Sequence, residues 1–204
     1  INNPFAVLSP YDLPVDEAGI FSREVYDYLI MYDEHQQKFV PALAKSWTRI
    51  DDKTMEMELR DDITFHNGDK FEAGDVKATV DYITDPKSKI TYGSRFSYMK
   101  QIEILGPHKL RIHGSEPMAT DLMIYAYRLQ IFNGKLMDKM ADKQDYGRVH
   151  PVGTGVYKVS SLDTNKGILV ERFDGYNTLP GKKANIRRVA GIPMPDKQTQ
   201  AAQM

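Results

Sequence analysis

The sequence predicts an α+β (mixed α/β) fold with mixed sheets, and two patterns along the chain support this class. Met55, Met57 and Leu59 alternate with polar residues, which is typical of a strand with one buried face. After the Asn67-Gly68 turn the spacing changes, and residues 72–83 repeat apolar side chains at helical intervals. Strands followed by helices and then by strands again favour this class over a doubly wound parallel sheet.

The other elements follow from the same two periodicities. A core helix is predicted for residues 18–31, whose apolar positions form one stripe: Phe21, Val25, Tyr28 and Leu29. A second strand is expected at Ile63 and Phe65, where the alternation continues. The turn Gly106-Pro107-His108 separates two alternating runs, which predicts a hairpin. Further predictions are helices at 119–129 and 134–141, a hairpin from 156–159 and 168–173, a strand at 188–193 and a helix from 197.

Length, charge and composition exclude several classes of function. The chain has 204 residues, no cysteine and a formal net charge of −1 at pH 7. A balanced charge disfavours a nucleic-acid binder or a polybasic membrane-surface protein. The lack of cysteine excludes a disulfide framework, a thiolate nucleophile and a zinc site built on sulfur. No run of 18 apolar residues is present, so we expect no membrane-spanning helix. No basic-then-apolar signal peptide precedes Ile1, so for an exported protein we expect the numbering to begin after processing or at an artificial boundary.

No group of residues has the spacing of a catalytic or metal centre. His66, Asp69 and Asp75 have suitable ligand atoms, but they span a turn that reverses the chain. Asp75 also stands where an N3 carboxylate reaches back to helix amides. Gly153-Thr-Gly155 lacks the phosphate-loop pattern, so its glycines are expected to permit a tight crossing between subdomains. We therefore expect no enzyme, no metal site and no cofactor.

Three segments, taken in order, carry a resemblance to a known family. They read PALAKSW at 41–47, LRDDITFHNGDKFEAGDV at 59–76 and PVGTGVY at 151–157. Together they resemble the family 5 extracellular (periplasmic) solute-binding proteins of ABC importers, of the oligopeptide-, dipeptide- and nickel-binding type. The resemblance extends from about residue 2 to residue 196.

The resemblance implies the N-terminal lobe of a type II periplasmic-binding-protein-like clamshell. Residues 1–45 and 172–204 would form the core subdomain of this lobe, and residues 46–171 would form an inserted subdomain. The helix expected from residue 197 stops in its second turn, so we expect the second lobe to be missing from this chain. The implied function is capture of a peptide or similar small solute between two lobes, outside the cytoplasm, for delivery to an ABC permease.

Two of the three loops expected to bind ligand lie near the start of the chain and after an apolar helix. In the first loop two prolines keep the chain extended, and relatives lay this region along the ligand. Its candidate ligand-binding residues are Leu8, Ser9, Tyr11 and Asp12. The other candidate is Arg128, which resembles a pocket arginine in some relatives; a surface ion pair is the alternative for this residue.

The remaining loop gathers four candidate residues within seven positions: Tyr92, Arg95, Phe96 and Tyr98. An arginine near aromatic rings suits capture of a carboxylate, because guanidinium pairs with both oxygens and also stacks on a ring. The alternative is that these aromatic side chains only pack beneath the loop, and the sequence leaves both interpretations open.

Two other functions compete with transport. Solute-binding lobes of this family also occur as sensors fused to transcription regulators, and such a lobe would have a similar sequence. A hydrolase would require a clustered catalytic group, which the sequence does not supply. A neighbouring permease gene would favour transport, and a helix-turn-helix segment would favour sensing.

Overall fold

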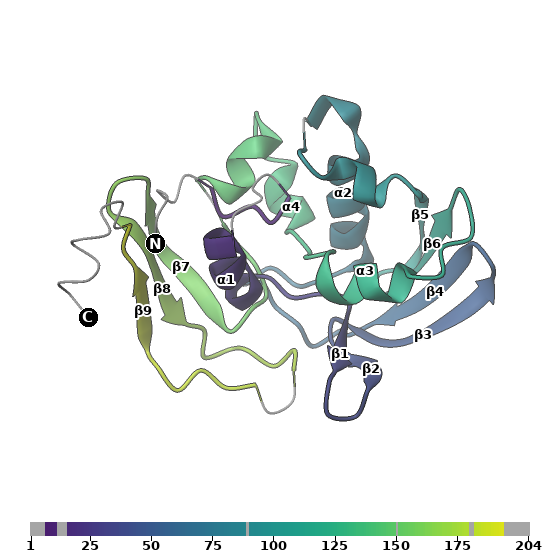
Figure 1. Cartoon of the computed structure of the whole chain (residues 1–204), viewed down its shortest axis with the longest axis horizontal. Helices are drawn as coiled ribbons and strands as arrows, with labels where there is room; N and C mark the ends of the chain where they lie inside the picture. The colour runs from purple at the N-terminus through teal and green to yellow at the C-terminus, as the bar shows by residue number, and fades with distance from the viewer. Residues whose placement is uncertain (1–6, 12–15, 89, 150, 180–181, 194–204) are drawn as a thin grey trace.

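The structure is a computed structural model that describes residues 7–11, 16–88, 90–149, 151–179 and 182–193. A four-stranded sheet lies at one end of the molecule, a three-stranded sheet at the other, and most helices lie between them (Figure 1). All strand pairs within the described residues are antiparallel. The α+β class is therefore confirmed, and the predicted mixed sheets are not seen in this part of the chain.

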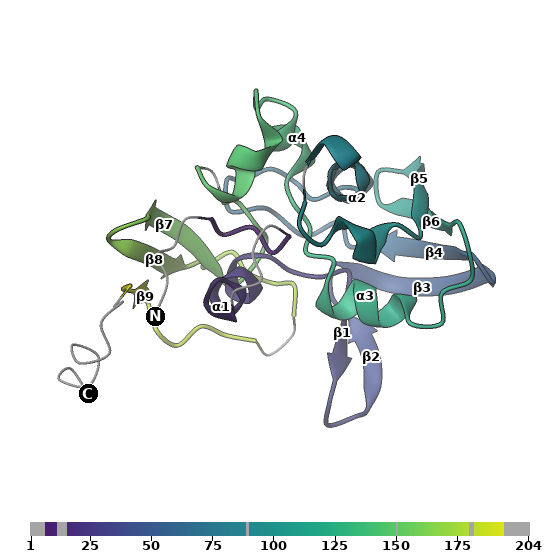
Figure 2. The same ribbon diagram turned by 45° about the horizontal axis from the view of Figure 1, so that its top comes forward.

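The elements follow one another in a simple order. They are α1 (Asp16–Val25), β1 (Ile30–Asp33), β2 (Lys38–Pro41), β3 (Ala44–Asp51), β4 (Thr54–Leu59), α2 (Ala73–Thr84), β5 (Met99–Gly106), β6 (Lys109–Gly114), α3 (Asp121–Tyr127), α4 (Gly134–Met137), β7 (Tyr157–Asp163), β8 (Gly167–Arg172) and β9 (Arg188–Gly191), with short 3₁₀ helices at Pro86–Ser88, Gly93–Phe96 and Lys143–Gly147. The β1–β2 hairpin projects away from the body of the molecule in both ribbon views (Figures 1 and 2).

The four-stranded sheet, ordered β3-β4-β6-β5, has one buried and one wet face. Strand β4 buries Met57 and Leu59 and leaves Glu56 and Glu58 half-buried, as the alternating pattern predicts. Strand β6 buries Leu110 in the same way, and it pairs with β5 through the predicted hairpin. Helix α2 lies against β5 and covers the apolar side. Two of the predicted strand patterns are thus confirmed.

Helix α2 begins as its first turn predicts. The backbone N–H of the N-cap residue Glu72 donates to Asp75 Oδ2 at 2.8 Å, which is the reciprocal half of a capping box. Asp75 Oδ1 accepts a second bond from the backbone N–H of Gly134, also at 2.8 Å. One buried carboxylate therefore fixes the start of α2 and the start of α4 together.

The three-stranded sheet β7-β8-β9 packs against α1 at the opposite end of the molecule. The predicted hairpin is confirmed as β7–β8, and the predicted strand at 188–193 is confirmed as β9. Phe21 of α1 lies against Gly191 of β9, where a Cβ atom would come within 2.8 Å of the ring. Segments far apart in the sequence therefore meet around α1.

Two predicted elements are wrong, each for a local reason. Ile63 and Phe65 are buried as expected, but Phe65 bonds to Asp69 and Phe71 bonds to Ile63, so they form a tight loop and no strand. The helix predicted for 18–31 ends at Val25, and the apolar residues after it continue into β1. Residues 29 and 30 are both fully buried, so apolar spacing alone did not separate a helix from a strand entering the core.

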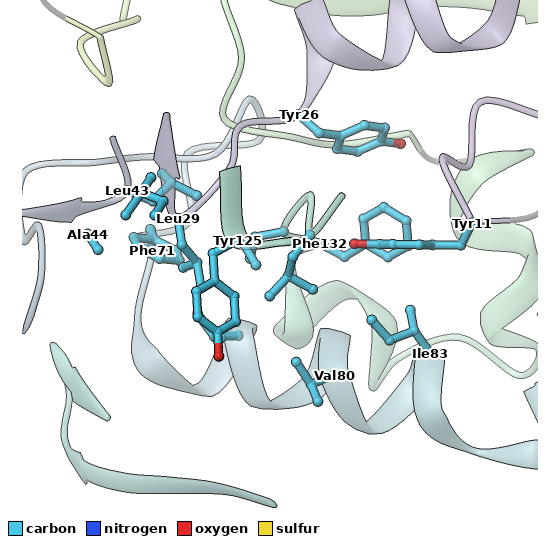
Figure 3. Close-up of a cluster of buried hydrophobic side chains, with 14 of the residues drawn as sticks. Tyr11, Tyr26, Leu29, Leu43, Ala44, Phe71, Val80, Ile83, Tyr125 and Phe132 are labelled. Carbon is cyan, nitrogen blue, oxygen red and sulfur yellow. The ribbon is translucent and has the colours of Figure 1, made fainter. Parts of the chain in front are cut away.

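Aromatic rings form the centre of the core between the two sheets. Tyr11 makes an edge-to-face contact with Phe132 at a centroid distance of 5.3 Å (Figure 3). It makes a second such contact with Phe96 at 5.6 Å. Phe132 also stacks on Tyr146 at 4.3 Å and lies 5.2 Å from Tyr26. Such pairs add stability beyond the burial of area, so this cluster joins the first segment of the chain to residues more than a hundred positions later.

The division into subdomains 1–45, 46–171 and 172–204 stays a prediction. Strands β7 and β8 fall mostly within the range predicted for the inserted subdomain, although they share a sheet with β9. The helix expected from residue 197 and the opening segment at residues 2–5 lie outside the described residues. Within the described ranges, no helix is long and apolar enough to cross a membrane.

Candidate solute-binding face

The first candidate loop is held inside the molecule. Leu8, Ser9 and Tyr11 are buried, and the backbone N–H of Leu8 donates to Gly147 O at 2.7 Å. The Tyr11 hydroxyl donates to the carbonyl oxygen of Gln130. Asp12 lies outside the described residues. The buried side chains therefore fix the position of this segment.

The second candidate loop divides into a buried pair and a more accessible pair. Phe96 and Tyr98 pack into the core, as the alternative interpretation of this loop predicts. Arg95 is exposed and its guanidinium lies 4.2 Å from the ring centre of the half-buried Tyr92. A guanidinium that lies over an aromatic ring can still direct its N–H groups outward to an anion. Arg95 is therefore accessible to solvent beside the partly accessible Tyr92, whereas Phe96 and Tyr98 pack beneath them.

The third candidate, Arg128, stands at the C-terminal end of α3 and is exposed. It forms no ion pair with a carboxylate within the described residues, so the alternative of a surface ion pair finds no support there. Tyr28 pairs with Gln130 through an isolated antiparallel bridge, which places Arg128 beside the chain that leaves α1.

The three loops converge through two contacts. The Tyr11–Phe96 ring contact joins the first loop to the second, and the Tyr11–Gln130 hydrogen bond joins the first to the third. Gln130 is 2 % exposed and was missed by the sequence argument, although a lone polar residue in the apolar run LQIF is a signal of a buried hydrogen-bonding role.

The His66 side chain holds the two glycines of the crossing loop. Its Nε2 lies 2.8 Å from Gly155 O, and its Nδ1 accepts a bond from the backbone N–H of Gly153 at 3.2 Å. A ring that donates at one nitrogen and accepts at the other must be neutral. Burial is the main reason that the pKa of His66 falls to about 4.

Burial has the opposite consequence for Asp75. It raises the pKa of this carboxyl to about 6, although the bonds from Glu72 and Gly134 lower it. Asp69 instead accepts bonds from Asn67 and Asn133, and these bonds lower its pKa. His66, Asp69 and Asp75 therefore have separate structural roles, and the described residues contain no group of three metal-binding side chains.

The shifted pKa values of His66 and Asp75 predict opposite effects of pH on stability. The unfolded chain binds a proton at His66 below pH 6.5 and the folded chain only below about 4, so stability is lost as the pH falls across this range. Asp75 binds its proton more tightly when folded, so its contribution rises as the pH falls from about 6 to 3.8. We expect a shallow pH dependence in the wild type between pH 6 and 4.

The substitution Asp75→Asn should reveal the pH dependence of stability that His66 contributes, because it removes the opposing contribution of Asp75. Urea unfolding at pH 7, 6, 5 and 4 should then show a loss of about 1 kcal/mol for each pH unit below 6, since one unit of pKa difference is worth about 1.4 kcal/mol. The double variant with His66→Gln is the control and should lose this slope. A flat profile in Asp75→Asn alone would contradict the role given to neutral His66.

Comparison with known proteins identifies the family. Residues 38–204 match the family model described as "Bacterial extracellular solute-binding proteins, family 5 Middle". The chain belongs to the family 5 solute-binding proteins. The glutathione-binding protein GsiB of Escherichia coli strain K12 is 27% identical over 208 residues, and the alignment covers 100% of this chain and 39% of the relative.

Several solved structures share the fold. NikZ from Campylobacter jejuni, in complex with Ni(L-His), superposes with a TM-score of 0.85 at 24% identity, covering 100% of this chain and 40% of its own. AppA from Bacillus subtilis, in complex with a nonapeptide, gives 0.87 at 18% identity, covering 100% and 40%. This family 5 chain spans about two fifths of the length of these relatives. The relatives are binding proteins and not enzymes, so the hydrolase alternative is set aside.

Proposed function

We propose that this chain is the N-terminal lobe of the substrate-binding component of an ABC importer. The full-length protein captures a peptide or similar small solute between two lobes and delivers it to a membrane permease from the periplasm or the cell exterior. The observation that supports this most is the match of the whole chain to about two fifths of each relative, as expected for one part of a two-lobed receptor. Closure of two lobes around a ligand is the motion such receptors use.

The chemistry of the relatives' ligands supports the choice of solute class. The proteins compared are described with glutathione, a nickel complex of histidine, a nonapeptide and agropinic acid. Each of these ligands carries a carboxylate group. The exposed Arg95 beside Tyr92, and the exposed Arg128, are the described candidate residues that can pair with such a group.

Arg95 gives a direct test of the second loop. In the full-length protein, Arg95→Gln should weaken binding of the solute that co-purifies with it by about tenfold, since a charge-assisted hydrogen bond is worth roughly 1.5–3 kcal/mol. Calorimetry measures the change, and Arg148→Gln is the control because it removes an exposed arginine from a different loop. Equal affinities for both variants and wild type would remove this loop from the site.

Uptake distinguishes transport from sensing. Cells that lack the full-length protein should lose uptake of the co-purifying solute, and the wild-type gene should restore it. Unchanged uptake, together with solute-dependent transcription that requires the protein, would contradict the importer function and favour a sensor lobe.

A further inference from the structure

The chain contains the dipeptide Asn-Gly twice, at Asn67-Gly68 and at Asn133-Gly134. The fold brings the two asparagines together at one carboxylate. Asn67 Nδ2 donates to Asp69 Oδ2 at 2.8 Å, and Asn133 Nδ2 donates to the same oxygen at 2.9 Å. Asn133 Nδ2 also donates to Asn67 Oδ1 at 3.4 Å. The two side chains therefore share one acceptor where the loop before α2 meets the start of α4.

An asparagine that precedes glycine is chemically reactive towards its own backbone. The glycine nitrogen attacks the side-chain carbonyl carbon Cγ and forms a new C–N bond. The amide proton of the glycine goes to the side-chain nitrogen, which leaves as ammonia. Solvent water then opens the resulting succinimide ring at one of its carbonyls and gives aspartate or isoaspartate. Glycine favours this attack because it has no Cβ and its backbone reaches conformations that are closed to other residues.

Asn67 has the surroundings that this reaction requires. Asn67 and Gly68 are both exposed, and the space where a Gly68 side chain would stand holds no atom within 4 Å. The Gly68 N–H donates to Phe65 O at 2.9 Å, and the Asp69 N–H donates to Asn67 Oδ1 at 3.2 Å. Because water reaches Asn67 and Gly68, these bonds can be exchanged for bonds to water at little cost. Local opening of the turn therefore frees the attacking nitrogen.

Asn133 belongs to the same dipeptide and has the opposite surroundings. It is fully buried, and its Oδ1 caps α4 by accepting from the Leu136 N–H at 2.8 Å. The nitrogen that would have to attack is that of Gly134, which donates to Asp75 Oδ1 at 2.8 Å. A Cβ atom built at Gly134 would lie 2.9 Å from Ala78 Cβ, so this backbone packs closely on α2. Reaction at Asn133 therefore requires α4 to separate from α2.

We propose that Asn67 is a site of spontaneous deamidation in the folded protein, and that the fold protects Asn133 from the same reaction. The structure of the turn explains why the reactive pair occurs at this position. Gly68 has a φ of +88°, in the left-handed region that favours glycine, and Asn67 Oδ1 closes an Asx turn to Asp69. The turn thus uses the two residue types that make it reactive. This inference does not depend on the proposed function.

Deamidation would weaken the loop around residue 67 in two ways. The product side chain has no N–H to donate to Asp69, and its carboxylate would lie beside one whose pKa is already lowered by its amide partners. The isoaspartate product also places its Cβ atom in the main chain, inside a loop that the Phe65 N–H closes by donating to Asp69 O at 2.8 Å. His66, which holds the crossing loop, is the neighbour of the modified residue. We therefore expect the modified protein to be less stable.

Peptide mapping by mass spectrometry of the 204-residue protein tests the proposal. The folded protein and the protein unfolded in guanidinium chloride are incubated at the same mildly alkaline pH, and the mass increase of deamidation is followed at Asn67 and Asn133. In the folded protein Asn67 should react at least about tenfold faster than Asn133, a ratio that corresponds to about 1.4 kcal/mol. In guanidinium chloride the two rates should agree within about threefold, because the protection of Asn133 is lost.

Two variants separate the reaction from its consequence. Asn67→Gln keeps the amide but would have to close a larger ring, so residue 67 should stay unmodified. Asn67→Asp carries the charge of the product and should unfold at a lower urea concentration than the wild type, as should the deamidated fraction isolated by ion exchange. Equal rates at the two asparagines in the folded protein, or no reaction at Asn67 while both react in guanidinium chloride, would overturn the assignment. An unchanged urea midpoint of the deamidated fraction would overturn the stated effect on stability.

Discussion

Gly153→Ala should destabilise the protein by at least about 3 kcal/mol, a size reserved for severe packing faults. A Cβ atom built at Gly153 would lie 1.9 Å from Val25 O and 2.7 Å from the Tyr26 ring. The neighbouring atom is backbone and cannot move aside like the end of a flexible side chain. The Gly153 carbonyl also accepts a hydrogen bond from the backbone N–H of His66, and its N–H donates to Nδ1 of the His66 ring, so a shift of the loop would break both bonds.

Gly74→Ala is the matched control for this substitution. Gly74 is an exposed residue in α2, and a Cβ atom there would have no atom within 4 Å. Replacing a helical glycine by alanine should stabilise the protein by about 0.5–1 kcal/mol. Chemical unfolding measures both variants. An effect of Gly153→Ala below about 1 kcal/mol would mean that the crossing between α1 and the Gly153-Thr-Gly155 loop is not tightly packed.

Tyr11→Ala should cost about 3–5 kcal/mol, the usual range for removing a buried aromatic side chain. Tyr11 is 1% exposed and touches Phe96 and Phe132, so its removal opens a cavity between the first loop and the core. It also leaves the Gln130 carbonyl without this donor. The prediction treats Tyr11 as a core residue and not as a side chain that contacts the solute.

Tyr11→Phe separates packing from hydrogen bonding. This variant keeps the ring and loses only the hydroxyl, so we expect a loss of about 1 kcal/mol. Thermal or urea unfolding of both variants provides the measurement. If Tyr11→Ala changed solute affinity strongly while leaving stability intact, Tyr11 would belong to the binding surface and the packing described for it would be wrong.

Periodicity predicted the parts of the fold whose partners are close in sequence. The alternation of Met57 and Leu59 with glutamates identified β4, and the turn at Pro107 identified the β5–β6 hairpin. The capping role of Asp75 also followed from its position three residues after the N-cap, since this contact is local.

Contacts between distant segments could not be predicted in this way. The end of α1 depends on where the chain meets Gln130 and the Gly153-Thr-Gly155 loop, more than a hundred residues later. The same limit applies to the candidate site. Residue type suggested Tyr11 and Phe96 as ligand contacts, but their mutual packing buries both.

The most direct test of the account compares solute binding by the full-length protein and by this 204-residue chain. The solute that co-purifies with the full-length protein is titrated into each in a calorimeter. Because a clamshell receptor gains affinity from both lobes, the chain alone should bind at least about a hundredfold more weakly, which corresponds to about 2.8 kcal/mol. Equal affinity of the two proteins would contradict the claim that this chain is one lobe of a receptor that closes around its ligand.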